Sequence, residues 1–409
     1  MRAMKHTIPK RVLFIGLAGM LLSLSACSKS VLYDEQTVGL EAYAQRQVPL
    51  ELYVEEEIKL GEYEPVSGVY TGAYVQKDEN ITGDLLAYER MLGQVQTFKV
   101  FEYNLEENLP AQELLRCMAQ KKVPYIKIVL DNNYDLTPLY HLVYDLKSAY
   151  GMPVFIELYP LTTRNYAPSE YKKIYQRAYE IVHKYVKNAI VVWSTDESRV
   201  SDMPLYYPGD KYIDWAGINI YIPRYKQGER YSYEGTKQLD FWYKNFQHTK
   251  PMLISSLAIS HFSRVDHVYT IHETQDQLTL FYKEVLESYP RLRGVLYMNV
   301  DMNAISNNNK EDYRLTTQPA LINTMKALTL PLACENTLQI PQKDKVPCYM
   351  KYSIIGTYFE DKLYISEEYM GTCFPKVNLK KVAKKQDLQG EVYYALDELS
   401  KYTACYYKS

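Results

Sequence analysis

Residues 206–221 read YYPGDKYIDWAGINIY, and this stretch decides the fold. Its first part predicts a turn, because proline fixes φ and glycine permits a positive φ, so the chain stops there before a strand begins. The strand from Ile213 to Tyr221 is mostly apolar without clean alternation, as is typical of a strand covered on both faces in a parallel sheet. Asn219 and Tyr221 come near its carboxyl end, where they either meet a ligand or cap a packed strand.

Strands and helices alternate from Val69 to about Leu328. Amphipathic stretches such as Tyr171–Val186 and Gln275–Ser288 repeat their apolar residues every three or four positions, as crossover helices require. The strand candidates number eight: Val69–Val75, Thr97–Tyr103, Val123–Leu130, Pro153–Tyr159, Ala189–Ser194, Ile213–Tyr221, Pro251–Ala258 and Gly294–Val300. This pattern predicts an α/β fold, a (β/α)8 TIM barrel over residues 65–330.

The composition argues against one class of partner. A net charge of -2 and a pI near 6.4 provide no broad basic field to attract phosphate backbones, so we expect no binding of nucleic acid. The 409 residues suffice for one barrel of about 250 residues with smaller additions. Tyrosine is unusually frequent, at 42 residues. Its flat ring and hydroxyl suit sugar stacking, and they equally suit strands and an extracellular surface.

The amino terminus has the pattern of a targeting signal and not of a folded domain. Three basic residues, Lys5, Lys10 and Arg11, precede an apolar run from Val12 to Leu22, and the letters LSAC follow at 24–27. This arrangement resembles a bacterial lipoprotein signal with its lipobox. It predicts a signal peptide over 1–26 and a mature chain that begins at a lipid-modified Cys27, exported and anchored to a bacterial membrane, facing the outside. The alternative is an ordinary cleaved signal peptide with a chance cysteine.

A polar, acid-rich segment separates this signal from the barrel. Residues 27–64 include three glutamates in a row at 55–57 and show no regular apolar period. Such a composition is typical of a solvated linker. We therefore expect residues 27–64 to be an acidic tether that lifts the barrel off the membrane surface.

The last segment, residues 331–409, differs in composition from the barrel. It holds four of the six cysteines and three strand-like runs. The cysteines are Cys334, Cys348, Cys373 and Cys405, and the runs are Tyr352–Phe359, Lys362–Ile365 and Glu391–Ala395. In an exported chain these features predict a small β-rich domain stapled by two disulfides, with three possible connectivities. The letters GTYFEDKLYISEEYMG at 356–371 resemble the small copper amine oxidase N-terminal-type modules of bacterial surface proteins, which implies a surface-associated module without copper chemistry.

Three stretches of the barrel carry a family resemblance. VVWS at 191–194, YYPGDKYIDWAGINIY at 206–221 and KPMLIS at 250–255 resemble glycoside hydrolase family 26, the mannanase-type barrels of clan A. The resemblance implies cleavage of β-linked mannans and related glucans. It also implies an acid/base glutamate after strand four and a nucleophilic glutamate at the end of strand seven, about 5 to 5.5 Å apart.

This sequence departs from the family at both carboxylate positions. By the spacing from Lys250, Ser256 stands where the nucleophile is expected, and Leu161 stands at the acid/base position. A serine hydroxyl without a neighbouring base is a poor nucleophile and does not stabilise an oxocarbenium ion as a carboxylate does. The first hypothesis is therefore a barrel that has lost catalysis and binds a polysaccharide or another component of the cell envelope in its cleft.

Other acids lie near the strand ends and support a second hypothesis. Glu157 lies on strand four, Asp196 and Glu197 follow strand five, and Asp301 follows strand eight. If a pair of these acids has taken over the chemistry, the protein is an active glycoside hydrolase with relocated carboxylates. Each acid has an alternative structural role: Glu157 as a buried acid with a basic or tyrosine partner, the others as loop-capping or solvated groups.

Ligand contacts are expected from four residues at the carboxyl ends of strands. Trp193 could stack on a sugar face or belong to the core, and His261 follows strand seven. Asn219 and Tyr221 match positions near the family's nucleophile. The sequence has no metal signature, no glycine-rich phosphate loop and no CxxC pair, so no cofactor and no metal are implied.

Overall fold

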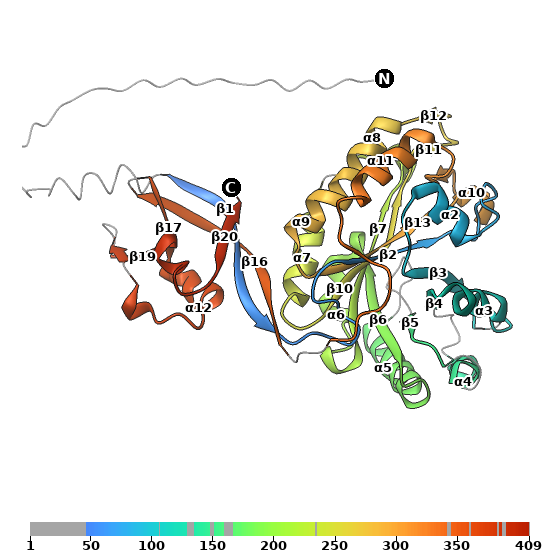
Figure 1. The fold of residues 1–409 in the computed structure, drawn as a ribbon, viewed down its shortest axis with the longest axis horizontal. Helices are drawn as coiled ribbons and strands as arrows, with labels where there is room; N and C mark the ends of the chain where they lie inside the picture. The colour runs from blue at the N-terminus through green and yellow to red at the C-terminus, as the bar shows by residue number, and fades with distance from the viewer. Residues whose placement is uncertain are drawn as a thin grey trace, which may run out of the picture.

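A computed structural model describes residues 46–408, except 106, 129–134, 148–150, 159–166, 234, 342–344, 360, 383 and 387–389 (Figure 1). Within this range the chain forms a barrel and a separate six-stranded sheet. The signal segment, Cys27, the first part of the expected tether and Leu161 lie outside the described residues.

Eight parallel strands close the barrel. In chain order they are β2 (Val69–Tyr74), β3 (Phe98–Tyr103), β4 (Val123–Ile128), β5 (Val154–Leu158), β6 (Ala189–Asp196), β7 (Trp215–Ile222), β10 (Met252–Ile259) and β13 (Leu292–Met298). Each strand pairs with the next, and β13 returns to pair with β2 through Gly294↔Tyr70 to Met298↔Tyr74. All eight strand candidates coincide with these strands, so the predicted TIM barrel is confirmed.

Helices cover the outside of the barrel (Figure 1). The longer ones are α2 (Leu85–Leu92), α3 (Ala111–Gln120), α4 (Thr137–Asp145), α5 (Pro168–Tyr185), α7 (Lys237–Phe246), α8 (Ile271–Thr279) and α11 (Pro319–Thr329). A π-helical turn at Leu280–Val285 and α9 (Leu286–Ser288) continue α8, and two single turns, α6 (Met203–Tyr206) and α10 (Met302–Ile305), follow β6 and β13. No helix among the described residues has the length and apolar character to cross a bilayer.

Aromatic side chains fill the barrel interior below the polar end. The ring of Phe155 lies 4.8 Å from Phe98 and 5.5 Å from Trp215 between centroids, in edge-to-face arrangements that favour aromatic pairs. Tyr70 and Tyr125 belong to the same buried cluster. This aromatic cluster fills the amino-terminal half of the barrel interior, and the buried polar residues Lys127, Glu157, Ser194 and Asn219 lie nearer the carboxyl ends of their strands.

Six short strands of two residues each lie around the barrel. They are β8 (Tyr225–Lys226), β9 (Glu229–Arg230), β11 (Phe262–Ser263), β12 (Val268–Tyr269), β14 (Glu311–Asp312) and β15 (Cys334–Glu335). β8 and β9 form one hairpin after β7, and β11, β12 and β14 form a small sheet after β10 and β13.

A six-stranded sheet, which we call the module, joins both ends of the described chain. Its spatial order is β18-β19-β17-β16-β1-β20. The strands are β1 (Gln47–Ile58), β16 (Val346–Phe359), β17 (Lys362–Ser366), β18 (Lys384–Gln386), β19 (Val392–Ala395) and β20 (Cys405–Lys408), with α12 (Met370–Cys373) and α13 (Leu396–Leu399) between them. Figure 1 shows the blue strand β1 beside the red strands β16 and β20.

Residues 47–58 correct the expected tether, because they form β1 inside the module. Leu50, Leu52 and Val54 point into the module's hydrophobic core, and the alternate positions on the other face hold Glu51, Tyr53, Glu55 and Glu57. This is the twofold alternation of a half-buried strand. The run of glutamates at 55–57 obscured it in the sequence.

The four cysteines of the last segment are free thiols, so the expected disulfide staples are absent from the described structure. Cys348 pairs in register with Glu56 and Cys405 with Val54, on opposite sides of β1. Two strand spacings separate them by about 9.5 Å, which exceeds the ~7 Å between Cα atoms that a disulfide spans. Cys334 lies in β15, beside the barrel strand β2. A hydrophobic core takes the place of the expected staples. The likeness to the copper amine oxidase modules stays a prediction.

A buried ion pair fixes the module to the amino-terminal side of the barrel. Arg291 donates from Nε and Nη2 to the two carboxylate oxygens of Glu64, at 3.0 and 3.1 Å, and both side chains are fully buried. The same guanidinium donates to the backbone carbonyls of Gln247 and Lys59. Gln247 in turn exchanges two hydrogen bonds with the backbone of Lys351 in β16, at 2.8 and 2.9 Å.

Substitution of Glu64 by alanine should lower the free energy of unfolding by about 3 to 5 kcal/mol, because it leaves the Arg291 charge buried without its partner. Chemical denaturation measures this loss. Glu57→Ala, which removes an exposed carboxylate nearby, is the matched control and should change stability by less than about 0.5 kcal/mol. Equal effects of the two substitutions would contradict the assignment.

Candidate functional site

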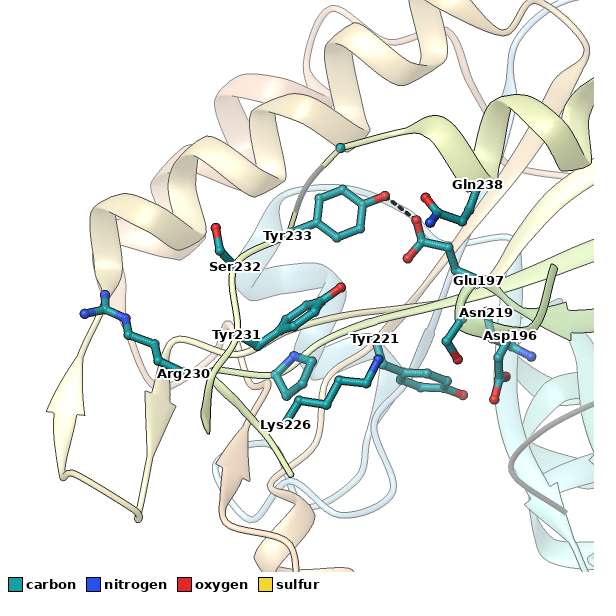
Figure 2. Close-up of a pocket in the computed structure, with 13 residues that line it drawn as sticks. Asp196, Glu197, Asn219, Tyr221, Lys226, Arg230, Tyr231, Ser232, Tyr233 and Gln238 are labelled. Carbon is teal, nitrogen blue, oxygen red and sulfur yellow. Dashed lines mark hydrogen bonds between the residues drawn. The ribbon is translucent and has the colours of Figure 1, made fainter. Parts of the chain in front are cut away.

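A cavity of about 740 Å³ opens at the carboxyl ends of β6 and β7, and we call it the cleft (Figure 2). Asp196 and Glu197 come from the end of β6 and the turn after it, and Asn219 and Tyr221 come from β7. The opposite wall is the segment 230–233, which follows the β8–β9 hairpin. The cleft lies where TIM barrels build their sites.

The floor beside the cleft is a hydrogen-bonded cluster around Lys127 of β4. The Lys127 ammonium lies 3.0 Å from Glu157 Oε2, donates to Asn219 Oδ1 at 3.1 Å and donates to Ser256 Oγ. Lys127 is 5% exposed and Glu157 is fully buried. Because the three ammonium protons meet three acceptors, this lysine is fully paired.

Glu157 receives donors from every side. Tyr125 OH donates to Oε2 at 2.9 Å, and Ser194 Oγ and Asn219 Nδ2 donate to Oε1. With the Lys127 ammonium, both carboxylate oxygens are saturated. Glu157 is therefore the counter-ion of the floor, which agrees with its structural alternative as a buried acid with a basic and a tyrosine partner and not with a free carboxylate at the substrate.

Ser256 lies on β10, in register with Asn219 on the neighbouring strand. Its side chain is fully buried, and its Oγ accepts a hydrogen bond from the Lys127 ammonium. Ser255 donates to Asn219 Oδ1 at 3.0 Å, so the two serines and the amide form one network. A serine that accepts from a charged lysine has no base to take its proton, and it stays a hydroxyl.

Asp196 and Glu197 are the two acids that line the cleft. Burial raises the pKa of Asp196 to about 6; the Glu157 charge adds to this rise and the Lys127 charge opposes it. Burial also raises the pKa of Glu197 to about 7, against the effect of the hydrogen bond from Tyr233. Oδ1 of Asp196 is a buried atom without a hydrogen-bond partner in the described part of the chain.

One hydrogen bond connects the segment 230–233 to Glu197, an acid that lines the cleft. Tyr233 OH donates to Glu197 Oε1 at 2.8 Å, which Figure 2 shows as a dashed line. Lys226 lies on the same side of the cleft, with its ammonium 5.2 Å from the centre of the Tyr231 ring. The cleft thus combines three tyrosines with groups that donate and accept hydrogen bonds.

Two expected ligand residues lie elsewhere. Trp193 is fully buried, donates from Nε1 to Tyr171 OH at 3.1 Å, and packs against Tyr207 and Phe246 on the helix side of the barrel. This position corrects its expected role in sugar stacking. The side chain points outward because adjacent residues of a strand face opposite sides, and Ser194 takes the inward position.

His261 and Asp301 form part of a different network at the rim. Asp301 pairs with both Nη atoms of Arg264, at 2.6 and 2.8 Å, and with Arg314. His261 is 1% exposed and hydrogen-bonds Thr317 at 3.2 Å. Neither residue lines the cleft. The sequence placed them correctly after their strands but did not reveal these partners.

The most connected residue of the site, Lys127, is not among the site residues expected from the sequence. Lys127 was visible as a lone charge inside the apolar run VPYIKIVL, and such a charge is buried only when it is paired. Lys226 and Tyr233 were missed because they come from the loop after β7, whose fold the strand pattern does not predict. Within the described residues, no group of three or more His, Cys, Asp or Glu side chains is arranged to hold a metal ion.

Residues 161–239 match the model of glycosyl hydrolase family 26. The match covers the part of the barrel that holds β6 and β7. Solved structures similar to the chain include family 26 enzymes. The Cellulomonas fimi endo-β-1,4-mannanase shares 13% identity over 67% of this chain and 73% of its own, with a TM-score of 0.49. The Bacteroides ovatus family 26 β-mannanase shares 12% identity over 75% of this chain and 98% of its own, with a TM-score of 0.47. No curated protein matches the sequence.

The raised pKa of Glu197 gives the stability of the barrel a testable pH dependence. Between the ordinary value of 4.5 and about 7, the folded protein holds a proton that the unfolded chain has released, so the free energy of unfolding falls as pH rises. Glu197→Gln should remove a fall on the order of 2–3 kcal/mol between pH 5 and pH 8. Denaturation at both pH values measures it, with Glu229→Gln on the exposed β9 as control. A pH dependence that Glu197→Gln leaves unchanged would contradict the burial of a protonated acid.

Proposed function

We propose that this protein binds a polysaccharide in the cleft of its family 26 barrel and does not hydrolyse it. The observation that carries the proposal is Ser256 hydrogen-bonded to the Lys127 ammonium, at the strand-seven position where the family resemblance expects a nucleophilic glutamate. A retaining glycosidase needs a carboxylate there to attack the anomeric carbon. In this chain the position carries a hydroxyl, and the nearest charge is a cation compensated by Glu157.

The electrostatics of the floor also oppose hydrolysis. A carboxylate about 5 Å from a developing oxocarbenium ion contributes roughly 3 kcal/mol of attraction at an effective dielectric constant of 20. The Lys127–Glu157 pair is close to neutral as a whole, so it does not provide this attraction to an oxocarbenium ion. The cleft nevertheless has side chains that suit the binding of a sugar. Tyr221 is 40% exposed within it, and tyrosine offers a sugar both an apolar face and a hydroxyl.

The wild-type protein should release no reducing sugar from mannan, mixed-linkage glucan or xylan and should bind at least one of them. Tyr221→Ala should weaken that binding by about tenfold, because it removes a stacking face. Affinity electrophoresis measures the change. Tyr402→Ala, which removes an exposed tyrosine of the module, should leave binding unchanged. Binding that survives Tyr221→Ala, or falls equally with Tyr402→Ala, would argue against the cleft.

A second candidate function rests on the two acids of the cleft. Asp196 and Glu197 both have raised pKa values, as acids that donate protons in catalysis often do, and both line the same cavity. Under this candidate the protein is an active glycoside hydrolase on a β-mannan or β-glucan, with these relocated carboxylates. Reducing-sugar release that disappears on Glu197→Gln would favour it over the non-hydrolysing barrel.

We further propose that the protein is an exported lipoprotein held to a bacterial membrane through Cys27. The lipobox-like LSAC at 24–27, after a basic and apolar segment, supports this. Labelled palmitate should be incorporated into the full chain and lost on Cys27→Ala, while Cys117→Ala, at a buried cysteine of α3, should retain the label. Label that persists on Cys27→Ala would refute the anchor.

A further inference from the structure

Basic side chains gather on the outer surface of α5. Between residues 168 and 188 the exposed charged residues are four cations and two acids: Lys173, Arg177, Lys184 and Lys187, against Glu170 and Glu180. Within the described part of the chain, none of these four cations is in an ion pair. Their charges are therefore available to an anionic partner outside the molecule.

The opposite side of the barrel carries the opposite charge. Along α8, the π-helical turn and α9, the exposed groups with a fixed charge are four acids and one lysine: Glu273, Asp276, Glu284, Glu287 and Lys283. Figure 1 shows α8 and α5 on opposite sides of the barrel. An anionic surface attracts the α5 side and repels the α8 side, so this distribution of charge would orient the molecule on such a surface.

The α5 side of the barrel also exposes apolar side chains. Leu115 and Met118 of α3 are 58% and 45% exposed, and Tyr140 and Tyr144 of α4 are 37% and 63% exposed. These helices follow the adjacent strands β3, β4 and β5, and the ring of Tyr140 lies 6.0 Å from that of Tyr185 on α5. We call the outer surface of α3, α4 and α5 the basic face. Lysines beside aromatic and aliphatic side chains are typical of residues at a membrane–water interface.

A cavity of about 370 Å³ lies on the basic face between α4 and α5. Lys173 and Arg177, one helical turn apart on α5, line it together with Tyr140 of α4. Asp135 also lines the cavity, and its Oδ1 accepts a hydrogen bond from the backbone N–H of Thr137 at 2.9 Å, at the start of α4. This carboxylate is therefore engaged by the helix, and the two cations are the groups that an incoming anion would meet.

We propose that the basic face docks onto a bilayer containing anionic phospholipids, with a phosphate headgroup between Lys173 and Arg177. A phosphate accepts charge-assisted hydrogen bonds from both side chains, and the exposed apolar residues of α3 and α4 enter the interface. The docking is separate from glycan binding and does not require an acyl anchor at Cys27. Because α4 and α5 lie along the side of the barrel, the cleft at the carboxyl ends of the strands stays open to a ligand (Figure 1).

Two charge-matched double variants test the docking. Lys173→Gln with Arg177→Gln removes two cations from the basic face, and Lys283→Gln with Lys326→Gln removes two from the π-helical turn and α11 on the other side. All four side chains are exposed, so both variants should fold, which thermal unfolding verifies.

The protein in every sample is the mature chain that the signal predicts, from residue 27, with Cys27→Ala so that no acyl chain contributes. The described barrel and module begin only at residue 46. Binding is measured by sedimentation with vesicles of phosphatidylcholine alone and with about one third phosphatidylglycerol, at low and at high salt.

We expect the unsubstituted chain to bind the anionic vesicles, to bind the neutral ones at least tenfold more weakly, and to lose affinity at high salt. The Lys173 and Arg177 double variant should bind the anionic vesicles about tenfold more weakly, and the control double variant should bind like the unsubstituted chain. Leu115→Gln should weaken binding about threefold, while Leu330→Gln, at a leucine that is 86% exposed after α11, should not change it.

Equal losses in the two double variants, or equal binding to neutral and anionic vesicles, would overturn the docking. Inorganic polyphosphate provides a soluble polyanion for comparison. If the chain binds it as tightly as it binds the vesicles, and Leu115→Gln weakens neither, the basic face takes a soluble polyanion and the membrane proposal is wrong. Glycan binding in the cleft is measured separately and stands or falls independently of these results.

Discussion

The buried ammonium of Lys127 is the group on which the floor of the cleft depends. It connects β4 to Glu157 on β5, to Asn219 on β7 and to Ser256 on β10, so one charge joins four strands of the barrel. A buried carboxylate costs several kcal/mol unless it is paired and fully hydrogen-bonded. Glu157 meets both conditions only because the lysine and three further donors surround it. The positions of Asn219 and Ser256 therefore follow from one requirement, which is that the buried charges of Lys127 and Glu157 are paired and fully hydrogen-bonded.

This requirement also explains why the groups that a ligand can meet lie at the rim of the cleft. The floor has no spare donor or acceptor on Lys127 or Glu157, so a ligand meets the residues above it. Those are Asp196 and Glu197, whose pKa values burial raises, and the tyrosines of the segment 230–233. Tyr233 connects the two groups through its hydrogen bond to Glu197. A shift of that segment would therefore change the shape of the cleft.

Local patterns in the sequence predicted the barrel because each strand and helix carries its own periodicity. They placed Asn219 and Tyr221 on the cleft and Ser256 on the correct strand. The face of a strand is harder to predict when both faces are apolar, which is why Trp193 was expected in the cleft although it packs against helices. His261 and Asp301 come after the right strands, but their partners are distant in the sequence.

The pairing of β1 has a consequence for how the chain folds. Its partners in β16 and β20 come only after the whole barrel in the sequence, so β1 closes one of the longest loops in the protein. Until that closure, the apolar positions of LELYV at 50–54 form an unpaired strand that is open to pairing with other chains. The glutamates at 55–57 flank this run as like charges and repel such partners, so the acidic stretch protects the waiting strand from aggregation.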